Sequence, residues 1–135
     1  MNVLETSLPG VKIIQPARHA DFRGAFMEIF QKARYAEAGI TEDFVQDNFA
    51  VNDKKGTIRG LHFQRPPAAQ TKLVYAVWGA VLDVVVDIRH GSPTFGQSET
   101  FHLTATDGNQ ILVPVGFAHG YCTLEDNTAV MYKVS

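Results

Sequence analysis

The chain has 135 residues, of which 45% are hydrophobic and 19% charged. It is therefore long enough for one globular domain with a real core, and too apolar for a disordered segment. A formal net charge of -2 excludes the overall basic field of nucleic-acid-binding and membrane-surface proteins, so neither partner is expected. The single cysteine, Cys122, excludes an internal disulfide, and no stretch resembles a signal peptide or membrane span. The expected location is the cytoplasm.

Turn-forming residues separate two short strand candidates near the start of the chain, at 11–15 and 25–30. Residues 31–38 are mostly good helix formers, and Gly39 follows them where a C-terminal cap belongs. We therefore predict one short helix near residues 31–38.

The rest of the chain consists of short β-branched and aromatic runs separated by turns. No strand–helix alternation occurs, which argues against a doubly wound parallel sheet. The regular succession of short strands and turns predicts an all-β sandwich or jelly roll in a single domain covering residues 1–135. The strand candidates lie at 44–51, 57–64, 71–78, 81–89, 99–104, 111–113, 118–124 and 128–134.

Gly79 lies between two strong strand candidates, and a two-residue turn there would make them a hairpin. Strand alternation would then place Lys72 on the same face as Asp83 and Asp87. The opposite, wholly apolar face of residues 82–88 is expected to pack in the core. The charged face either points to water or is buried with its charges paired, and the pattern alone leaves both possibilities open.

Residues 59–64 place a guanidinium and an imidazole in one strand candidate. His62 is the best candidate for a general base, because its ordinary pKa of about 6.5 leaves it able to take a proton near neutral pH. A lone strand histidine is, however, more often structural. Arg59 and His62 are three residues apart, so a regular strand would point them to opposite faces. We predict a bulge at Gly60 if both line one pocket.

Residues 114–119 have the pattern Pro-x-Gly-x-x-His, which is similar to the second cupin motif. Metal-binding cupins add a His-x-His pattern in their first motif, where this chain has His62-Phe63-Gln64. His62 and His119 alone are too few for an ordinary zinc or iron site. No metal is therefore expected, and a metal-dependent cupin oxygenase stays as an alternative that metal analysis would test.

Five segments in order along nearly the whole chain resemble the dTDP-4-dehydrorhamnose 3,5-epimerase family. The resemblance implies a cupin jelly roll that works without a cofactor. It also implies epimerisation of dTDP-4-dehydro-6-deoxy-D-glucose at C3 and C5, beside the C4 ketone, to give dTDP-4-dehydro-L-rhamnose, and a homodimer formed through exchanged N-terminal strands. The matching segments are 21–24, 44–48, 59–64, 91–96 and 114–120.

The same resemblance implies roles for individual residues. His62 would be the base, Tyr132 the acid on the opposite side of the sugar, and Lys72 the group that stabilises the enolate. It further implies that Asp83 supports the site by pairing with Lys72, which favours the buried reading of that charged face. Substrate-binding matches are Arg23 and Arg59 for the pyrophosphate, His119 near the ketone, and Glu28, Gln46, Asp47 and Asn48 for other contacts, with a structural role for Asp47 left open.

Family members continue past the position of residue 135 with a segment that carries a carboxylate orienting the base and an aromatic residue stacking on thymine. We therefore expect a single cupin domain that lacks this C-terminal segment. Two alternatives stay open: a related dTDP-keto-sugar 3-epimerase, 5-epimerase or ketoisomerase of another deoxysugar pathway, and a nucleotide-sugar-binding module without catalysis.

Overall fold

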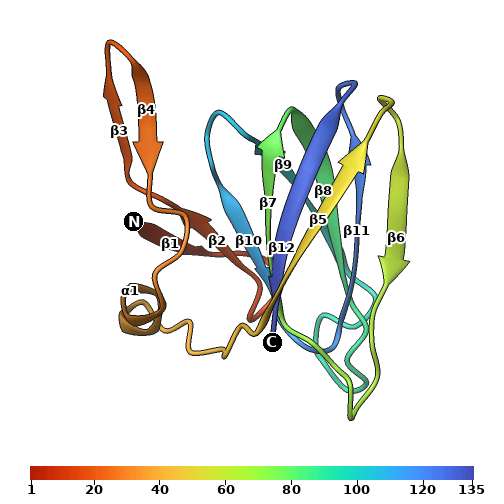
Figure 1. Cartoon of the computed structure of the whole chain (residues 1–135). Helices are drawn as coiled ribbons and strands as arrows, with labels where there is room; N and C mark the ends of the chain where they lie inside the picture. Colours follow the sequence, from red (N-terminus) through yellow and green to blue (C-terminus); the bar gives the residue numbers. More distant parts are fainter.

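The computed structural model describes all 135 residues, which form two antiparallel sheets packed face to face and a separate hairpin (Figure 1). The larger sheet has the strand order β1 (Asn2–Glu5), β2 (Lys12–Gln15), β10 (Gln110–Val113), β7 (Lys72–Trp78), β12 (Thr128–Val134), β5 (Gln46–Asn52). The smaller sheet has the order β6 (Ile58–His62), β11 (Phe117–Thr123), β8 (Ala80–Asp87), β9 (Ser98–Thr104). The hairpin consists of β3 (Arg18–Asp21) and β4 (Gly24–Met27). This is the predicted all-β jelly roll.

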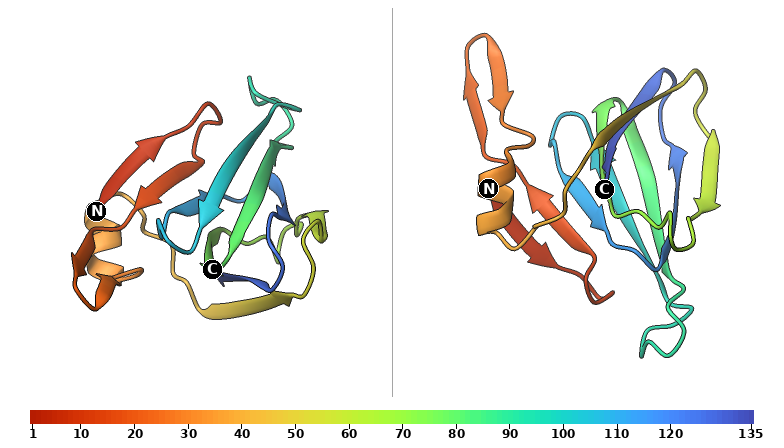
Figure 2. Two further views of the ribbon diagram at one scale, coloured as in Figure 1. Left: turned by 90° about the horizontal axis from the view of Figure 1, so that it is seen from above. Right: turned by 60° about the horizontal axis from the view of Figure 1, so that its bottom comes forward.

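The hairpin β3–β4 stands away from the two sheets, and the loop between β8 and β9 projects from the end of the sandwich (Figures 1 and 2). The tip of the hairpin carries Phe22, which is 97% exposed, and Phe26 in β4 is 70% exposed. The two aromatic side chains thus form an exposed apolar surface on the hairpin.

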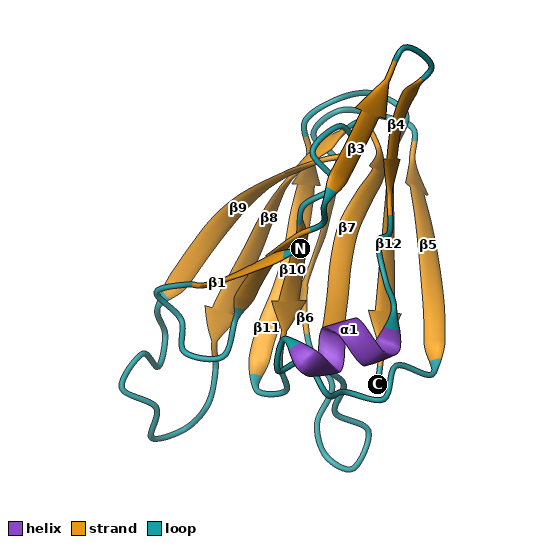
Figure 3. Cartoon of the chain, turned by 90° about the vertical axis from the view of Figure 1, so that its left-hand side faces the viewer, coloured by secondary structure: helices purple, strands orange, loops and turns teal.

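The predicted helix is present as α1 (Lys32–Glu37) and packs on the outer face of the larger sheet (Figure 3). Gln31 caps its first turn by accepting a hydrogen bond from the backbone N–H of Arg34, and Gly39 follows its end with a φ of +79°. Tyr35 is its buried anchor, and burial raises the pKa of this phenol to about 12. No helix in the chain is long and apolar enough to cross a membrane.

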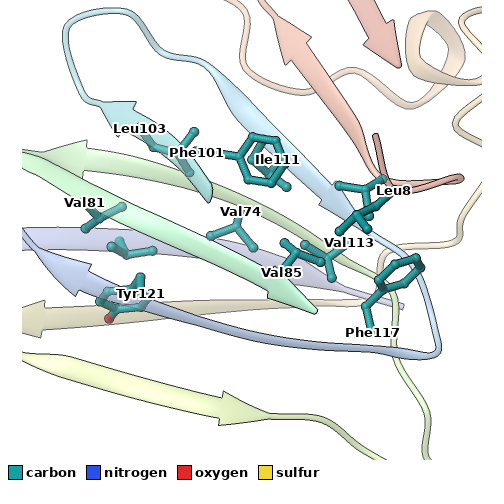
Figure 4. Packing of buried hydrophobic residues seen from close by; sticks show 12 residues of the cluster. Leu8, Val74, Val81, Val85, Phe101, Leu103, Ile111, Val113, Phe117 and Tyr121 are labelled. Carbon is teal, nitrogen blue, oxygen red and sulfur yellow. The ribbon is translucent and has the colours of Figure 1, made fainter. Parts of the chain in front are cut away.

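The core lies between the inner faces of the two sheets (Figure 4). Each face contributes alternate residues of its strands, as expected for a sandwich in which strand side chains point alternately inward and outward. The buried cluster consists of Leu8, Val11, Val74, Val81, Val85, Phe101, Leu103, Ile111, Val113, Phe117, Tyr121 and Val130.

The eight predicted strands after the helix all occur, but two short strands near the start were missed. β1 lies at the edge of the larger sheet and pairs only with β2. All four residues of β3 are exposed, so this strand has no apolar face that a sequence pattern could display. Both strands are held by backbone pairing rather than by burial, which leaves little signal in the side chains.

The predicted hairpin at Gly79 is wrong, because β7 and β8 belong to different sheets. The chain crosses from one sheet to the other at this glycine, and a Cβ there would lie 2.6 Å from Thr128 Oγ1. The apolar face expected in the core is also wrong: Leu82 is 37% exposed on the outside of β8. Asp83 and Asp87 are instead fully buried on the inner face.

Candidate active site

One cavity of about 430 Å³ lies between the sheets beside β5 and β6, each of which is an edge strand. Five strands contribute to its wall, two from the smaller sheet and three from the larger. Its polar groups are a guanidinium, an ammonium, two imidazoles and two phenols. The lining residues are Ala50, Arg59, Gly60, His62, Lys72, His119, Tyr121 and Tyr132.

A bulge in β6 brings Arg59 and His62 to this cavity together. His62 pairs with His119 of β11, whereas Arg59 pairs with Tyr121, so three steps along β6 face two along β11. Gly60 makes this possible with a φ of +96°. The predicted irregularity is confirmed.

Two glycines let β6 and β11 approach closely at the bulge. A Cβ at Gly60 would lie 2.6 Å from the carbonyl oxygen of His119, and a Cβ at Gly120 would lie 2.6 Å from the carbonyl oxygen of Arg59. Neither position has room for a side chain without a backbone shift. The spacing of the two strands, and hence of the two imidazoles, depends on both glycines.

Lys72 begins β7 and is only 8% exposed. Burial lowers the pKa of Lys72, and the negative charge of Asp83 opposes that change. Burial also lowers the pKa of His62, and the charges of Lys72 and His119 lower it further. His62 is therefore neutral at pH 7 and able to accept a proton.

Asp83 contacts His119 rather than Lys72. Its Oδ2 lies 2.8 Å from His119 Nε2, and both side chains are buried. Asp83 and His119 lie on neighbouring strands of the smaller sheet, whereas Lys72 lies in the opposite sheet, so the predicted direct pair with Lys72 does not form. Asp83 Oδ1 has no hydrogen-bond partner.

This contact decides which nitrogen of His119 can meet a ligand. An ionised carboxylate only accepts hydrogen bonds, so His119 Nε2 carries a proton and donates a hydrogen bond to Asp83 Oδ2. Nδ1 is the nitrogen left for the cavity. In a neutral ring Nδ1 accepts a hydrogen bond, and in a protonated ring it donates one.

The predicted binding residues of β5 divide between its two faces. Asn48 pairs with Tyr132 in the sheet and accepts a hydrogen bond of 2.8 Å from Gln46 Nε2. Both lie on the face of β5 that carries the cavity residue Ala50. Asp47 points the other way and forms an ion pair of 2.8 Å with Lys133.

Arg23 and Glu28 are not at this cavity within the single chain. Arg23 lies on the β3–β4 hairpin, where it pairs with Asp21 at 2.6 Å and its side chain is 76% exposed. Glu28 pairs with Arg34 at 2.8 Å. The hairpin and β6 lie on opposite sides of the molecule (Figure 1).

The sequence reasoning missed two polar residues of the site, Asn52 and Tyr121. Asn52 Oδ1 accepts a hydrogen bond of 2.7 Å from Arg59 Nε. Tyr121 lines the cavity. Strand parity could have found both, because Asn52 follows Asn48 by four residues in β5 and Tyr121 follows His119 by two in β11.

No three His, Cys, Asp or Glu side chains of the chain come together as a group that could hold a metal ion. The two cavity imidazoles have only one carboxylate nearby, and it is bonded to His119. Fold and site together define a jelly roll of the cupin class whose cavity carries proton-transfer groups.

Comparison with known proteins then identifies the family. The family model described as dTDP-4-dehydrorhamnose 3,5-epimerase matches residues 5–135. The enzyme of that name from Shigella flexneri is 47% identical over 136 aligned positions, which cover 100% of this chain and 75% of that protein. The chain belongs to the dTDP-4-dehydrorhamnose 3,5-epimerase family.

Solved structures agree with this assignment. The Bacillus anthracis dTDP-4-dehydrorhamnose 3,5-epimerase with TDP and PPi bound has a TM-score of 0.96 and 49% identity, covering 98% of this chain and 76% of its own. The Legionella pneumophila dTDP-6-deoxy-D-glucose-3,5-epimerase in complex with dTDP-4-keto-L-rhamnose has a TM-score of 0.92 and 46% identity, covering 98% and 70%.

Proposed function

We propose that this chain epimerises dTDP-4-dehydro-6-deoxy-D-glucose at C3 and C5 to give dTDP-4-dehydro-L-rhamnose. Membership of the family supports the reaction. The observation that carries it is the presence of His62, Lys72 and Tyr132 in the wall of one cavity. These residues supply a base, a cation and an acid for proton transfer beside a ketone.

In the proposed reaction His62 removes the proton from the carbon next to the C4 ketone. The electron pair of the broken C–H bond forms a C=C bond while the π pair of the ketone moves to its oxygen, and the enolate forms beside the Lys72 ammonium, which stabilises its negative charge. Tyr132 then donates its phenolic proton to the opposite side of the same carbon. Return of the His62 proton to solvent and reprotonation of Tyr132 complete the cycle.

His119 has a defined part in this scheme. With Nε2 bonded to Asp83, a neutral His119 accepts a hydrogen bond at Nδ1 and suits a sugar hydroxyl. Donation to the ketone oxygen would require protonation of the ring. We assign enolate stabilisation to Lys72, and contact with the sugar near the ketone to Nδ1 of His119.

The anionic nucleotide requires cationic partners at the mouth of the cavity. Arg59 lines the cavity, and no carboxylate pairs with it, so its guanidinium is the first candidate for the pyrophosphate. Asn48 and Gln46 lie on the face of β5 that carries the cavity residue Ala50, and their amide groups can form hydrogen bonds with the rest of the ligand.

The proposed active form is a homodimer in which the β3–β4 hairpin of one copy reaches the cavity of the other. The exposed Phe22 and Phe26 support this arrangement, as do the positions of Arg23 and Glu28 away from their own cavity. Light scattering should give twice the chain mass. Mixing Arg23→Ala with His62→Ala chains should restore turnover that neither variant has, because one site of each mixed dimer is then intact.

Hydrogen exchange in heavy water tests the reaction. The wild type should introduce deuterium at C3 and C5 of the keto-sugar, detected by NMR. His62→Ala should slow exchange by about 10²–10⁴-fold. Tyr132→Phe should retain more exchange than inversion, because removal of the proton does not need the phenol.

Other outcomes of this assay select the alternatives. Exchange at one carbon alone would indicate a 3- or 5-epimerase. Binding of dTDP without exchange at either carbon would indicate a binding module. Loss of exchange on treatment with a chelator, restored by a metal, would overturn the metal-free mechanism.

A further inference from the structure

Asn52, a buried residue of β5, holds the cavity residue Arg59 by a hydrogen bond. Asn52 ends β5 and is 2% exposed. Its Oδ1 accepts a hydrogen bond of 2.7 Å from Arg59 Nε, and the carbonyl oxygen of Val51 accepts a second, of 3.3 Å, from Arg59 Nη2. Two adjacent residues of β5 thus hold the Nε–Nη2 edge of the guanidinium.

The amide of Asn52 is itself fixed in orientation. Its Nδ2 donates to the carbonyl oxygen of Thr128 at 3.1 Å and to the hydroxyl of Tyr121 at 3.3 Å. Asn52 also pairs with Thr128 in the register of β5 and β12. With both amide hydrogens engaged, Oδ1 is left as an acceptor, and its shortest hydrogen bond is the one from Arg59.

The bonded edge of the guanidinium leaves its other edge free. A guanidinium has five N–H donors, and β5 occupies one on Nε and one on Nη2. The Nη1 hydrogens and the second Nη2 hydrogen remain, and they form the end-on fork that matches two oxygens of a phosphate. Since Arg59 lines the cavity, this fork is the part available to a ligand there.

We infer that Asn52 is a positioning residue that orients Arg59 to bind the diphosphate of the substrate. The inference rests on the proposed function for the identity of the ligand. Asn52 has no role in proton transfer, because its polar atoms are all occupied by Arg59, Thr128 and Tyr121. Its loss should therefore weaken nucleotide binding and leave the chemical step close to the wild-type rate.

The first test needs no ligand. In the ¹⁵N NMR spectrum of the free protein, the Nε–H of Arg59 should be protected from exchange with water, and Asn52→Ala should remove that protection. Val81→Ala is the matched control, because it truncates a buried core side chain in β8, a strand that does not pair with β6, the strand of Arg59. Unchanged protection in Asn52→Ala would overturn the inference.

The second test is a double-mutant cycle on binding of thymidine diphosphate, measured by calorimetry. Asn52→Ala should weaken binding by about tenfold, and should change it less than twofold in an Arg59→Ala background. Equal losses in both backgrounds would show that Asn52 acts independently of Arg59 and would overturn the inference.

These two tests also separate the inference from the proposed function. If the wild type fails to bind thymidine diphosphate, the proposed substrate is wrong, and the NMR result still decides whether Asn52 orients Arg59. In the exchange assay, a rise in KM with an unchanged kcat supports the positioning role, and a fall in kcat alone contradicts it.

Discussion

Asp83 and Asp87 lie four residues apart on the inner face of β8, and both are fully buried, yet their surroundings differ. Asp87 accepts hydrogen bonds from the backbone N–H, Nε and Nη2 of Arg89, and from the hydroxyls of Ser92 and Thr94. Asp83 accepts one, from His119, and its Oδ1 has none. The carboxylate of Asp87 is thus saturated by hydrogen bonds from the loop that follows it. The carboxylate of Asp83 is open, because it contacts the cavity residue His119 and has one oxygen without a partner.

The saturated carboxylate stabilises the fold. The hydrogen bonds from the Arg89 side chain, followed by those from Ser92 and Thr94, hold the pKa of Asp87 far below its usual range despite burial. The Arg89 guanidinium also lies 4.4 Å from the ring centroid of Phe117, which belongs to the core. Segment 91–96 is one of the five that resemble the family, and no role was predicted for it. Its Ser92 and Thr94 donate to Asp87, so the segment anchors the β8–β9 loop.

Replacing the saturated carboxylate should have the largest effect on stability. Asp87→Asn removes the charge and puts a donor NH2 in place of one of the two oxygens that accept from Arg89, Ser92 and Thr94, and should lower the free energy of unfolding by about 2–4 kcal/mol. Urea denaturation measures this change. Asp21→Asn, which breaks an exposed pair with Arg23, is the matched control and should change the stability far less.

Replacing the open carboxylate should act on the reaction instead. Asp83→Asn removes the charge that orients His119 and opposes the lowered pKa of Lys72. Hydrogen exchange into the keto-sugar should slow by about 10–100-fold, with a smaller loss of stability than Asp87→Asn. The comparison fails if Asp83→Asn unfolds the protein as readily and leaves the exchange rate of the folded fraction unchanged.

The stability that Asp87 contributes should depend on pH. Because the folded-state pKa of Asp87 is depressed, its contribution to stability is complete above the ordinary carboxyl pKa of about 4 and is lost as the pH falls toward the folded value. The difference in unfolding free energy between wild type and Asp87→Asn should therefore shrink between pH 5 and pH 2. A constant difference over this range would contradict the assignment.

The smallest effect concerns the titration of His62. The charge of Lys72 contributes to the lowered pKa of His62, so Lys72→Met should raise that pKa toward its ordinary value. An NMR titration of the imidazole in the ligand-free protein measures the change. A pKa that stays the same would mean that the charge of Lys72 does not contribute to the shift.

The sequence predicted those parts of the fold that depend on local patterns. The helix is marked by its helix formers and Gly39, and the strands by β-branched runs between turns. The crossing at Gly79 was missed because a glycine permits both a tight reversal and a passage between sheets. Only the partners of β7 and β8, which lie far along the chain, decide between them.

The site was predictable where local irregularity has a sequence sign. Gly60 between Arg59 and His62 indicated the bulge, because parity would otherwise separate the two side chains. The partner of Asp83 was not predictable, since it depends on which sheet each strand joins. Strand parity places Asn52 on the same face of β5 as Asn48, but its hydrogen bond to Arg59 depends on contacts between strands that a sequence pattern does not give.

Strand β6 pairs on one side only, with β11, and carries both Arg59 and His62. A shift of this strand would displace the guanidinium and the imidazole together, since only two residues separate them. Anchoring an anion at one end of the pair therefore restrains the other. Binding of a diphosphate and the proton step are linked by a few peptide units, so analogues without a diphosphate should be processed slowly even when they fill the sugar pocket.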